Sequence, residues 1–154
     1  METQFVSQFG LMQQYFSETF QRLFGGGNGE ISLSNPNDPL NCGIEIIVQP
    51  PGKKRQLLSL FSGGERALTA IAILFAMLKL KPTPFCILDE IEAALDDANI
   101  SYFADYLKEF SKDTQFIVVT HRKGTMERCD TLFGVAMEER GISSMVSVNL
   151  KDYQ

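Results

Sequence analysis

The segment SLFSGGERALTAIAILFAMLKLKPTPFCILDE, residues 59–90, decides the fold, because it joins a glycine-opened helix to a short buried strand. Apolar residues occupy nearly all sides of the helix expected after Ser62, which is typical of a helix at the centre of a domain. Pro82 and Pro84 end this helix. The following run, FCILDE, has the continuous apolar character of a parallel strand buried on both faces.

The chain beyond this segment alternates helix and strand. Residues 96–110 carry apolar side chains at helical spacing, with Asp96 or Asp97 as the expected N-cap. The run QFIVVTH, residues 115–121, predicts a second buried strand, and residues 131–150 predict a closing hairpin around EERGI. This alternation predicts an α/β fold.

The first fifty residues predict a helix followed by an antiparallel strand pair. Apolar residues between Phe5 and Leu23 recur at steps of three and four, and the glycines at 25–27 end the helix. EISLS and GIEIIVQP then alternate as strands do, with a proline-containing loop between them. The basic run at residues 53–55 is most simply a solvated loop, and contact with phosphate or an acidic partner is the alternative.

Composition indicates a single globular domain without an obvious nucleic-acid surface. The chain has 154 residues, 44% of them hydrophobic, and a formal net charge of −5. Its three cysteines form no CxxC pair, so reduced thiols in a cytoplasmic protein are the simplest interpretation. We expect no signal peptide and no membrane span, because the longest apolar stretch is shorter than the roughly 20 residues a bilayer requires.

The motif SGGE, residues 62–65, supports two compatible interpretations. Ser62 and Glu65 fit a capping box, in which the serine caps the helix and the glutamate reaches back. The same helix end exposes backbone N–H groups and the positive end of the helix dipole, and Gly63 and Gly64 carry no side chain that would block a phosphate. An isolated SxxE is most often only a cap.

Three polar residues follow the two predicted buried strands. Asp89 and Glu90 lie at the carboxyl end of the first strand, where open α/β sheets bind ligands. The first acid can hold Mg²⁺ through water and the second can polarise an attacking water. His121, the only histidine, follows the second strand and could reach a phosphate. The structural alternatives are an exposed acidic pair and a structural histidine.

The order of these motifs resembles the ATPase head of the SMC proteins, the chromosome condensation and cohesion ATPases of the ABC class, in their bacterial type. FSGGERALTAIAILFA resembles the family's signature motif, and FCILDEIEAALDDAN resembles its Walker B strand and D-loop. FIVVTHRKGTME resembles its switch-histidine segment, and similarity extends upstream through LFGGG and VQPPGKK. One departure is Phe61, where the signature usually begins with leucine.

No P-loop of the form GxxxxGK[ST] is present. The glycines at 25–27 lack the GK[ST]. In PGKKR, Ile47 stands where the first glycine should be, and no Ser or Thr follows the lysines, which are followed by Arg55. The resemblance therefore implies the C-terminal half of the head: an α/β lobe with a parallel sheet core and antiparallel strands, lacking the P-loop half. Residues 1–24 would be the root of a coiled-coil arm, and residues 25–154 the lobe.

The resemblance also implies residue roles, with ATP and Mg²⁺ as ligands. Asp89 would hold Mg²⁺, while Glu90 and His121 would be catalytic on their own head. Ser62, Gly63, Gly64, Glu65 and Asp96 would contribute to the nucleotide site across an interface of two heads. The expected partners are the N-terminal half of the same polypeptide, a second head, the winged-helix domain of the kleisin subunit, and DNA.

Two other interpretations remain open at this stage. The chain could belong to another ABC-type ATPase, such as a DNA-repair relative, although ERALTAIAILFA and THRKGTME favour SMC. Alternatively, the isolated chain could be a non-catalytic module that binds the kleisin. We expect the chain alone to be inactive, and ATP hydrolysis to need the P-loop half and head dimerisation. The expected location is the cytoplasm, in association with the nucleoid.

Overall fold

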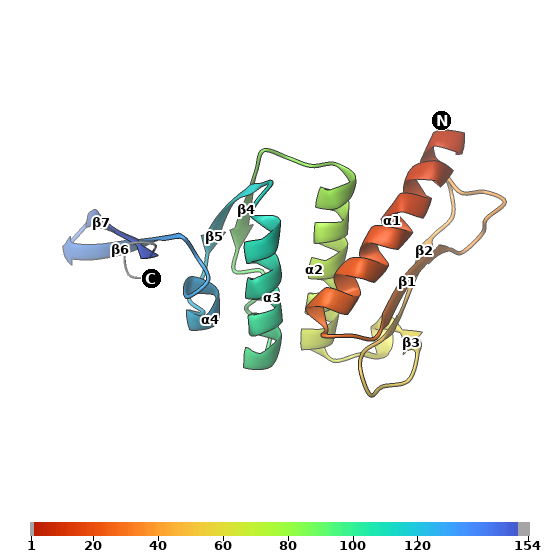
Figure 1. The fold of residues 1–154 in the computed structure, drawn as a ribbon, viewed down its shortest axis with the longest axis horizontal. Coiled ribbons are helices and arrows are strands. Elements are labelled where there is room, and N and C mark those ends of the chain that lie inside the picture. The colour runs from red at the N-terminus through yellow and green to blue at the C-terminus, as the bar shows by residue number, and fades with distance from the viewer. Residues whose placement is uncertain (1, 151–154) are drawn as a thin grey trace.

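A computed structural model describes residues 2–150, with the side chains of Glu2 and Glu138 excepted. In chain order the elements are α1 (Glu2–Leu23), β1 (Asn28–Leu33), β2 (Ile44–Gln49), β3 (Gln56–Leu57), the 3-10 turn η1 (Leu58–Leu60), α2 (Gly63–Leu80), β4 (Phe85–Asp89), α3 (Asp97–Phe110), β5 (Gln115–Val119), α4 (Lys123–Met126), β6 (Thr131–Glu139) and β7 (Ile142–Asn149). Figure 1 shows α1, α2 and α3 side by side, with a strand pair on either side of them.

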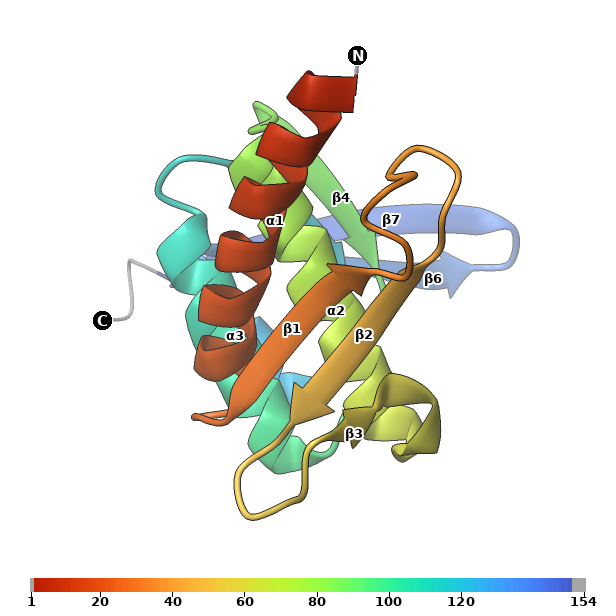
Figure 2. The ribbon, with the colours of Figure 1, turned by 90° about the vertical axis from the view of Figure 1, so that its right-hand side faces the viewer.

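The strands form three small sheets. β1, β2 and β3 pair antiparallel in that order, β4 pairs with β5 in parallel, and β6 and β7 form an antiparallel hairpin. Figure 2 shows the first sheet lying across α1 and α2. The predicted α/β class, the β1–β2 pair, the parallel pair and the hairpin are therefore confirmed. The two-residue strand β3 and the short helix α4 were not predicted.

Helix α2 occupies the centre that its apolar sequence predicts. It lies between α1 and α3 (Figure 1) and buries much of its length. The ring of Phe75 is fully buried and meets four other aromatic rings, of which Tyr106 is edge-on at 5.1 Å between centroids. The other three belong to Phe103, Phe110 and Phe116. Phe75 thus joins α2 to α3 and β5.

Helix α1 is fixed to the lobe at its C-terminal end. Phe16, Phe20 and Leu23 are fully buried. Gly27, in the turn after the helix, has a φ of +80°, and a Cβ there would lie 2.2 Å from the Gln49 carbonyl oxygen. Only glycine fits this turn, which brings β1 back alongside α1. The predicted helix is confirmed, whereas its continuation into a coiled-coil arm stays a prediction.

The prediction that β4 and β5 are buried on both faces is wrong for this chain. Leu88 lies in the core, with Cys86, Phe116 and Val118 packed against it. The alternate residues are about half exposed: Phe85, Ile87, Ile117 and Val119. Within residues 2–150 the helices cover one face of this pair, so the continuous apolar sequence has no second layer to pack against.

Replacing Phe75 with alanine should remove the aromatic contacts that join α2, α3 and β5. We expect Phe75→Ala to lower the free energy of unfolding by about 3–5 kcal/mol, the usual loss for a buried phenylalanine. Met77→Ala is a matched control on the same helix, because Met77 is 56% exposed. Chemical denaturation checks the prediction, and equal losses for the two variants would contradict it.

Candidate functional site

The predicted site residues gather at one end of the lobe. Strands β4 and β5 run in parallel, so their carboxyl ends meet at the same edge, with Asp89 in register with Val119. Helices α2 and α3 begin at this same end, the lower end in Figure 1. A Cβ on Gly64 would lie 3.1 Å from the Ala94 carbonyl oxygen, so the start of α2 approaches the segment after β4.

Glu90 and His121 face each other across this edge. The Glu90 backbone N–H donates to the Val119 carbonyl at 2.9 Å, which extends the strand pairing by one residue. Glu90 Oε1 then lies 3.3 Å from His121 Nδ1, and both side chains are exposed. Glu90 has a φ of 48°, a left-handed conformation that is uncommon for residues other than glycine. The predicted carboxylate and histidine therefore form one exposed pair.

The start of α2 is a complete capping box, as predicted. Ser62 Oγ accepts from the Glu65 backbone N–H at 3.4 Å and donates to Glu65 Oε2 at 2.8 Å, while the Ser62 N–H donates to the same carboxylate. Gly63 and Gly64 form the first turn, and nothing lies within 4 Å of a Cβ built on Gly63. The helix end is thus open to an anion.

The basic loop before α2 reaches this helix end. Lys53 Nζ lies 2.8 Å from Glu65 Oε1 of the same chain, whereas contact of the basic run with phosphate or an acidic partner stays a prediction. Burial raises the pKa of the Glu65 carboxyl, but hydrogen bonds from Lys53 and Ser62 outweigh it and hold that pKa below its ordinary value. Glu65 is therefore charged and already paired with residues of its own chain.

Asp96 and Asp89 have different surroundings. Asp96 is the N-cap of α3, and its side chain accepts from the Asn99 backbone N–H at 2.8 Å. Asp89 is exposed at the end of β4. Among the described residues, no three His, Cys, Asp or Glu side chains lie close enough together to hold a metal ion. The exposed Asp89 carboxylate is a ligand type that Mg²⁺ accepts, but Asp89 alone does not complete a site, and Mg²⁺ at this residue stays a prediction.

One polar residue of this edge was missed from the sequence. The Glu92 side chain is fully buried, and its Oε1 accepts hydrogen bonds from the hydroxyls of Thr120, at 2.5 Å, and Thr125, at 3.1 Å. These contacts connect the segment after β4 with the segment after β5. A glutamate inside EIEAAL was the only available sign, and nothing in the sequence distinguishes it from an exposed residue.

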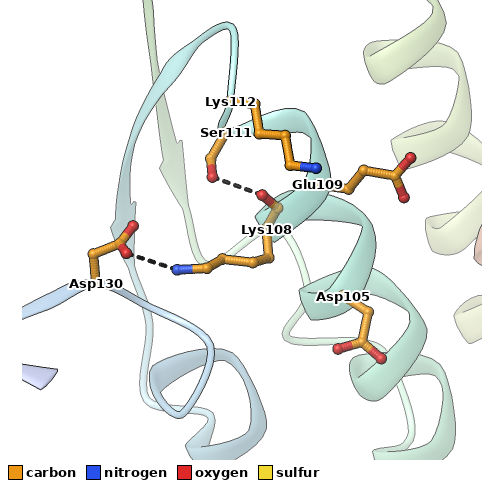
Figure 3. A pocket seen from close by; sticks show the side chains of 6 residues that line it. All are labelled: Asp105, Lys108, Glu109, Ser111, Lys112 and Asp130. Carbon is orange, nitrogen blue, oxygen red and sulfur yellow. Dashed lines mark hydrogen bonds and ion pairs between the residues drawn. The ribbon is translucent and has the colours of Figure 1, made fainter. Parts of the chain in front are cut away.

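Two surface pockets formed by described residues lie elsewhere, and none of the predicted site residues lines them. Figure 3 shows one beside the C-terminal half of α3, where Lys108 Nζ pairs with Asp130 at 2.7 Å. The remaining lining residues are charged or polar: Asp105, Glu109, Ser111 and Lys112. Among the described residues the candidate site is therefore an exposed edge, with Asp89, Glu90 and His121 open to solvent.

Known proteins share sequence and fold with this chain. The family described as RecF/RecN/SMC N terminal domain matches residues 5–144. The chain belongs to this family. The chromosome partition protein Smc of Bacillus subtilis (strain 168) is 59% identical to this SMC-family chain over 152 residues, which are 99% of the chain and 13% of that protein. The chain thus spans about one eighth of that relative's length.

Two solved structures show a similar fold. One, from work on ATP-driven dimerization and DNA stimulated activation of SMC ATPases, is 42% identical with a TM-score of 0.91, covering 99% of this chain and 92% of the solved one. The other is the Smc head domain with an extended coiled coil from Pyrococcus furiosus, bound to the C-terminal domain of ScpA. It is 46% identical with a TM-score of 0.85, covering 94% of this chain and 36% of the solved one.

These matches confirm the SMC ATPase head fold but not every detail of the prediction. The family description names an N-terminal domain, so the comparisons do not support the predicted placement in the C-terminal half of the head. No helix among the described residues is long and apolar enough to cross a membrane. The residue roles, and ATP and Mg²⁺ as ligands, stay predictions.

Removing the Lys53 amine should destabilise the lobe in a pH-dependent way. Because the Glu65 pKa is lowered in the folded chain, its pair with Lys53 contributes stability above pH 4.5, the ordinary pKa of a glutamate, and loses it as pH falls through the lowered pKa. We expect Lys53→Gln to cost below about 1 kcal/mol at pH 7.

The measurement is denaturant unfolding of wild type and variant between pH 3 and pH 7. The two curves should converge toward the acid end. Lys54→Gln is the matched control, because Lys54 is an exposed neighbour with the same charge. A difference for Lys53→Gln that does not change with pH, or an equal effect of Lys54→Gln, would contradict the prediction.

Proposed function

We propose that this chain is the half of an SMC ATPase head that carries the signature motif, Walker B strand, D-loop and switch histidine. In this proposal it hydrolyses ATP only after joining a P-loop half and meeting a second head. The family membership and the head-like fold support the proposal at the coarser level. The residue-level roles rest on the geometry of the site edge.

The observation that carries the proposal is the contact between Glu90 and His121. A carboxylate and an imidazole that approach within 3.3 Å at the carboxyl edge of a parallel strand pair suit the activation of a water. Both are exposed, so a nucleotide and water could reach them from the solvent side. Both side chains are more than half exposed, so packing alone does not explain their contact.

Hydrolysis would proceed by in-line attack of water on the γ-phosphorus of ATP. Glu90 would accept a proton from the attacking water. The oxygen of that water would bond to the γ-phosphorus while the bond from the γ-phosphorus to the bridging β,γ-oxygen breaks. His121 would orient the Glu90 carboxylate and donate toward the γ-phosphate. Mg²⁺, partly held through Asp89, would neutralise charge on the phosphates.

The start of α2 would serve the nucleotide held by the opposite head. Ser62, Gly63 and Gly64 present an open helix end with free space around Gly63, and such ends bind phosphate. Glu65 completes the cap, and Asp96 of the D-loop would lie at the same interface. ATP would in this way join two heads, and its hydrolysis would release them.

The exposed face of β4 and β5 supports the need for a second half. Ile87 is 60% exposed, and it and its neighbours on that face form an apolar surface that would need a covering layer in water. Since the chain has no P-loop, we propose that a P-loop half of the same polypeptide covers this face. We keep the C-terminal placement of this chain as part of the proposal, with α1 as the root of a coiled-coil arm.

The remaining partners are proposed from the relatives and the family resemblance. Solved Smc heads are bound to the C-terminal domain or C-winged helix domain of ScpA, and we propose a kleisin contact of this kind here. DNA organisation through head dimerisation, with the protein in the cytoplasm at the nucleoid, belongs to the same proposal. The acidic net charge of −5 gives DNA contact no independent support.

The proposal predicts that Glu90→Gln separates binding from hydrolysis. The amide keeps the size and polarity of the side chain but does not accept the water's proton, so we expect ATP-dependent head association to persist and turnover to fall at least about 100-fold. The assay compares wild type and variant, each assembled with the matching P-loop half. Asp105→Asn is a control carboxylate on α3, because Asp105 pairs with Arg128 and with none of the predicted site residues. Normal hydrolysis by Glu90→Gln would refute the proposed role.

Turnover by the chain alone, compared with the assembled head, tests the split-head proposal itself. Hydrolysis only in the assembled head supports it, whereas hydrolysis by the chain alone would overturn it. A chain that neither hydrolyses nor contributes to turnover in the assembled head, yet binds the kleisin domain, would be a non-catalytic binding module.

A further inference from the structure

We propose that Glu92 is a positioning residue for the Glu90–His121 pair, and this inference rests on the proposed ATPase function. Glu92 does not face the open edge. It lies beneath the edge with 0% of its surface exposed and connects the segment that follows β4 to the segment that follows β5. Its contacts hold His121 where the imidazole reaches Glu90.

A contribution to stability does not explain why Glu92 is buried with so few hydrogen-bond partners. Both hydroxyl partners of Glu92 bond to the same oxygen, Oε1, while Oε2 is buried with no hydrogen-bond partner among the described residues. No cation lies within ion-pair distance of Glu92 in the described part of the chain. Burying a polar group with one oxygen left unpaired destabilises a fold, and proteins keep such arrangements where they serve a site.

The contacts of Glu92 lead directly to His121. Thr120 Oγ1 donates to Glu92 at 2.5 Å and accepts from the Arg122 backbone N–H at 3.0 Å. The Arg122 guanidinium in turn donates to the carbonyl of Leu95, which is also buried. The residues on both sides of His121 are therefore fixed to residues 92–95, just after Glu90.

The second hydroxyl contact of Glu92 serves a different element. Thr125 lies in α4, and a Cβ on the neighbouring Gly124 would come within 2.9 Å of Ile100, so α4 packs tightly on α3. The Thr125 hydroxyl bond therefore anchors α4 to Glu92, and the separate bond from the Thr125 backbone N–H to the Arg122 carbonyl does not use that hydroxyl. The two threonines offer a matched pair: each gives one hydroxyl bond to the same oxygen, but only Thr120 adjoins the histidine.

The Glu90–His121 contact needs this support because neither side chain is held by packing. Their side chains are 55% and 63% exposed, so packing does not fix their rotamers, and the backbone positions determine whether the two groups are within reach of each other. Displacing a reacting group by about 1 Å can reduce a rate about 100-fold. Loss of the Thr120–Glu92 bond would free the loop that carries His121 and increase the distance between His121 and Glu90.

The test measures ATP turnover and KM in the head assembled from this chain and its P-loop half. We expect Thr120→Val to lower kcat by roughly 10-fold or more, with KM for ATP within about twofold of wild type. Thr120→Ser, which keeps the hydroxyl, should restore kcat. Thr125→Val removes the other bond and should leave kcat near wild type while lowering the denaturation midpoint.

A His121→Ala background separates positioning from general destabilisation. If Thr120 acts through the imidazole, Thr120→Val should lower kcat less than twofold further when His121 is already absent, because coupled residues are not additive. Glu92→Leu should behave like Thr120→Val, and Glu92→Gln, whose amide oxygen accepts both hydroxyls, should recover most of the turnover. Thr120→Ala replaces Thr120→Val if the valine variant does not fold.

Failure of this inference and failure of the proposed function give different results. Equal kcat values for Thr120→Val and Thr125→Val, or a full additive loss in the His121→Ala background, would overturn the positioning role while wild-type turnover and the Glu90→Gln loss persist. Absence of turnover in the assembled wild-type head, or normal turnover by Glu90→Gln, would overturn the ATPase function and with it the inference.

Discussion

The parallel register of β4 with β5 is the constraint on which the candidate site depends. It brings the ends of two strands, separated by a whole helix in sequence, to one edge at adjacent positions. A shift of the pairing by one residue would move Leu88 out of the core and separate Glu90 from His121. The aromatic packing of Phe75 against α3 and β5 therefore matters to the site, because it holds the layer on which this register rests.

Much of this arrangement could be predicted from sequence because its signals are local. The 3.6-residue period of α1 and the capping box at Ser62 depend only on neighbours along the chain. The order of the strand-end residues then placed Glu90 and His121 at one edge, since parallel strands share their carboxyl ends. The contact between them follows from topology rather than from any property of the two residues alone.

The parts that could not be predicted depend on long-range packing. Glu92 is buried where Thr120 and Thr125, about 30 residues later in the chain, bond to it. The spacing of apolar residues around Glu92 does not indicate these distant contacts. The prediction that both faces of β4 and β5 are buried was wrong for a different reason. The apolar residues of these strands alternate on both faces of the strand pair, and the described residues cover one of those faces. Whether a strand is buried thus depends on everything that packs against it. The apolar run indicates two covering layers, although the described residues supply only one.

The left-handed backbone at Glu90 gives this edge a further property. A residue with a Cβ held at a φ of 48° costs the fold on the order of 1 kcal/mol that glycine would not. The position that the proposed chemistry requires is therefore one where glycine would favour folding. Under the proposed function, glycine at this position would favour folding but would remove the carboxylate that activates water, so stability and hydrolysis place opposite demands on Glu90.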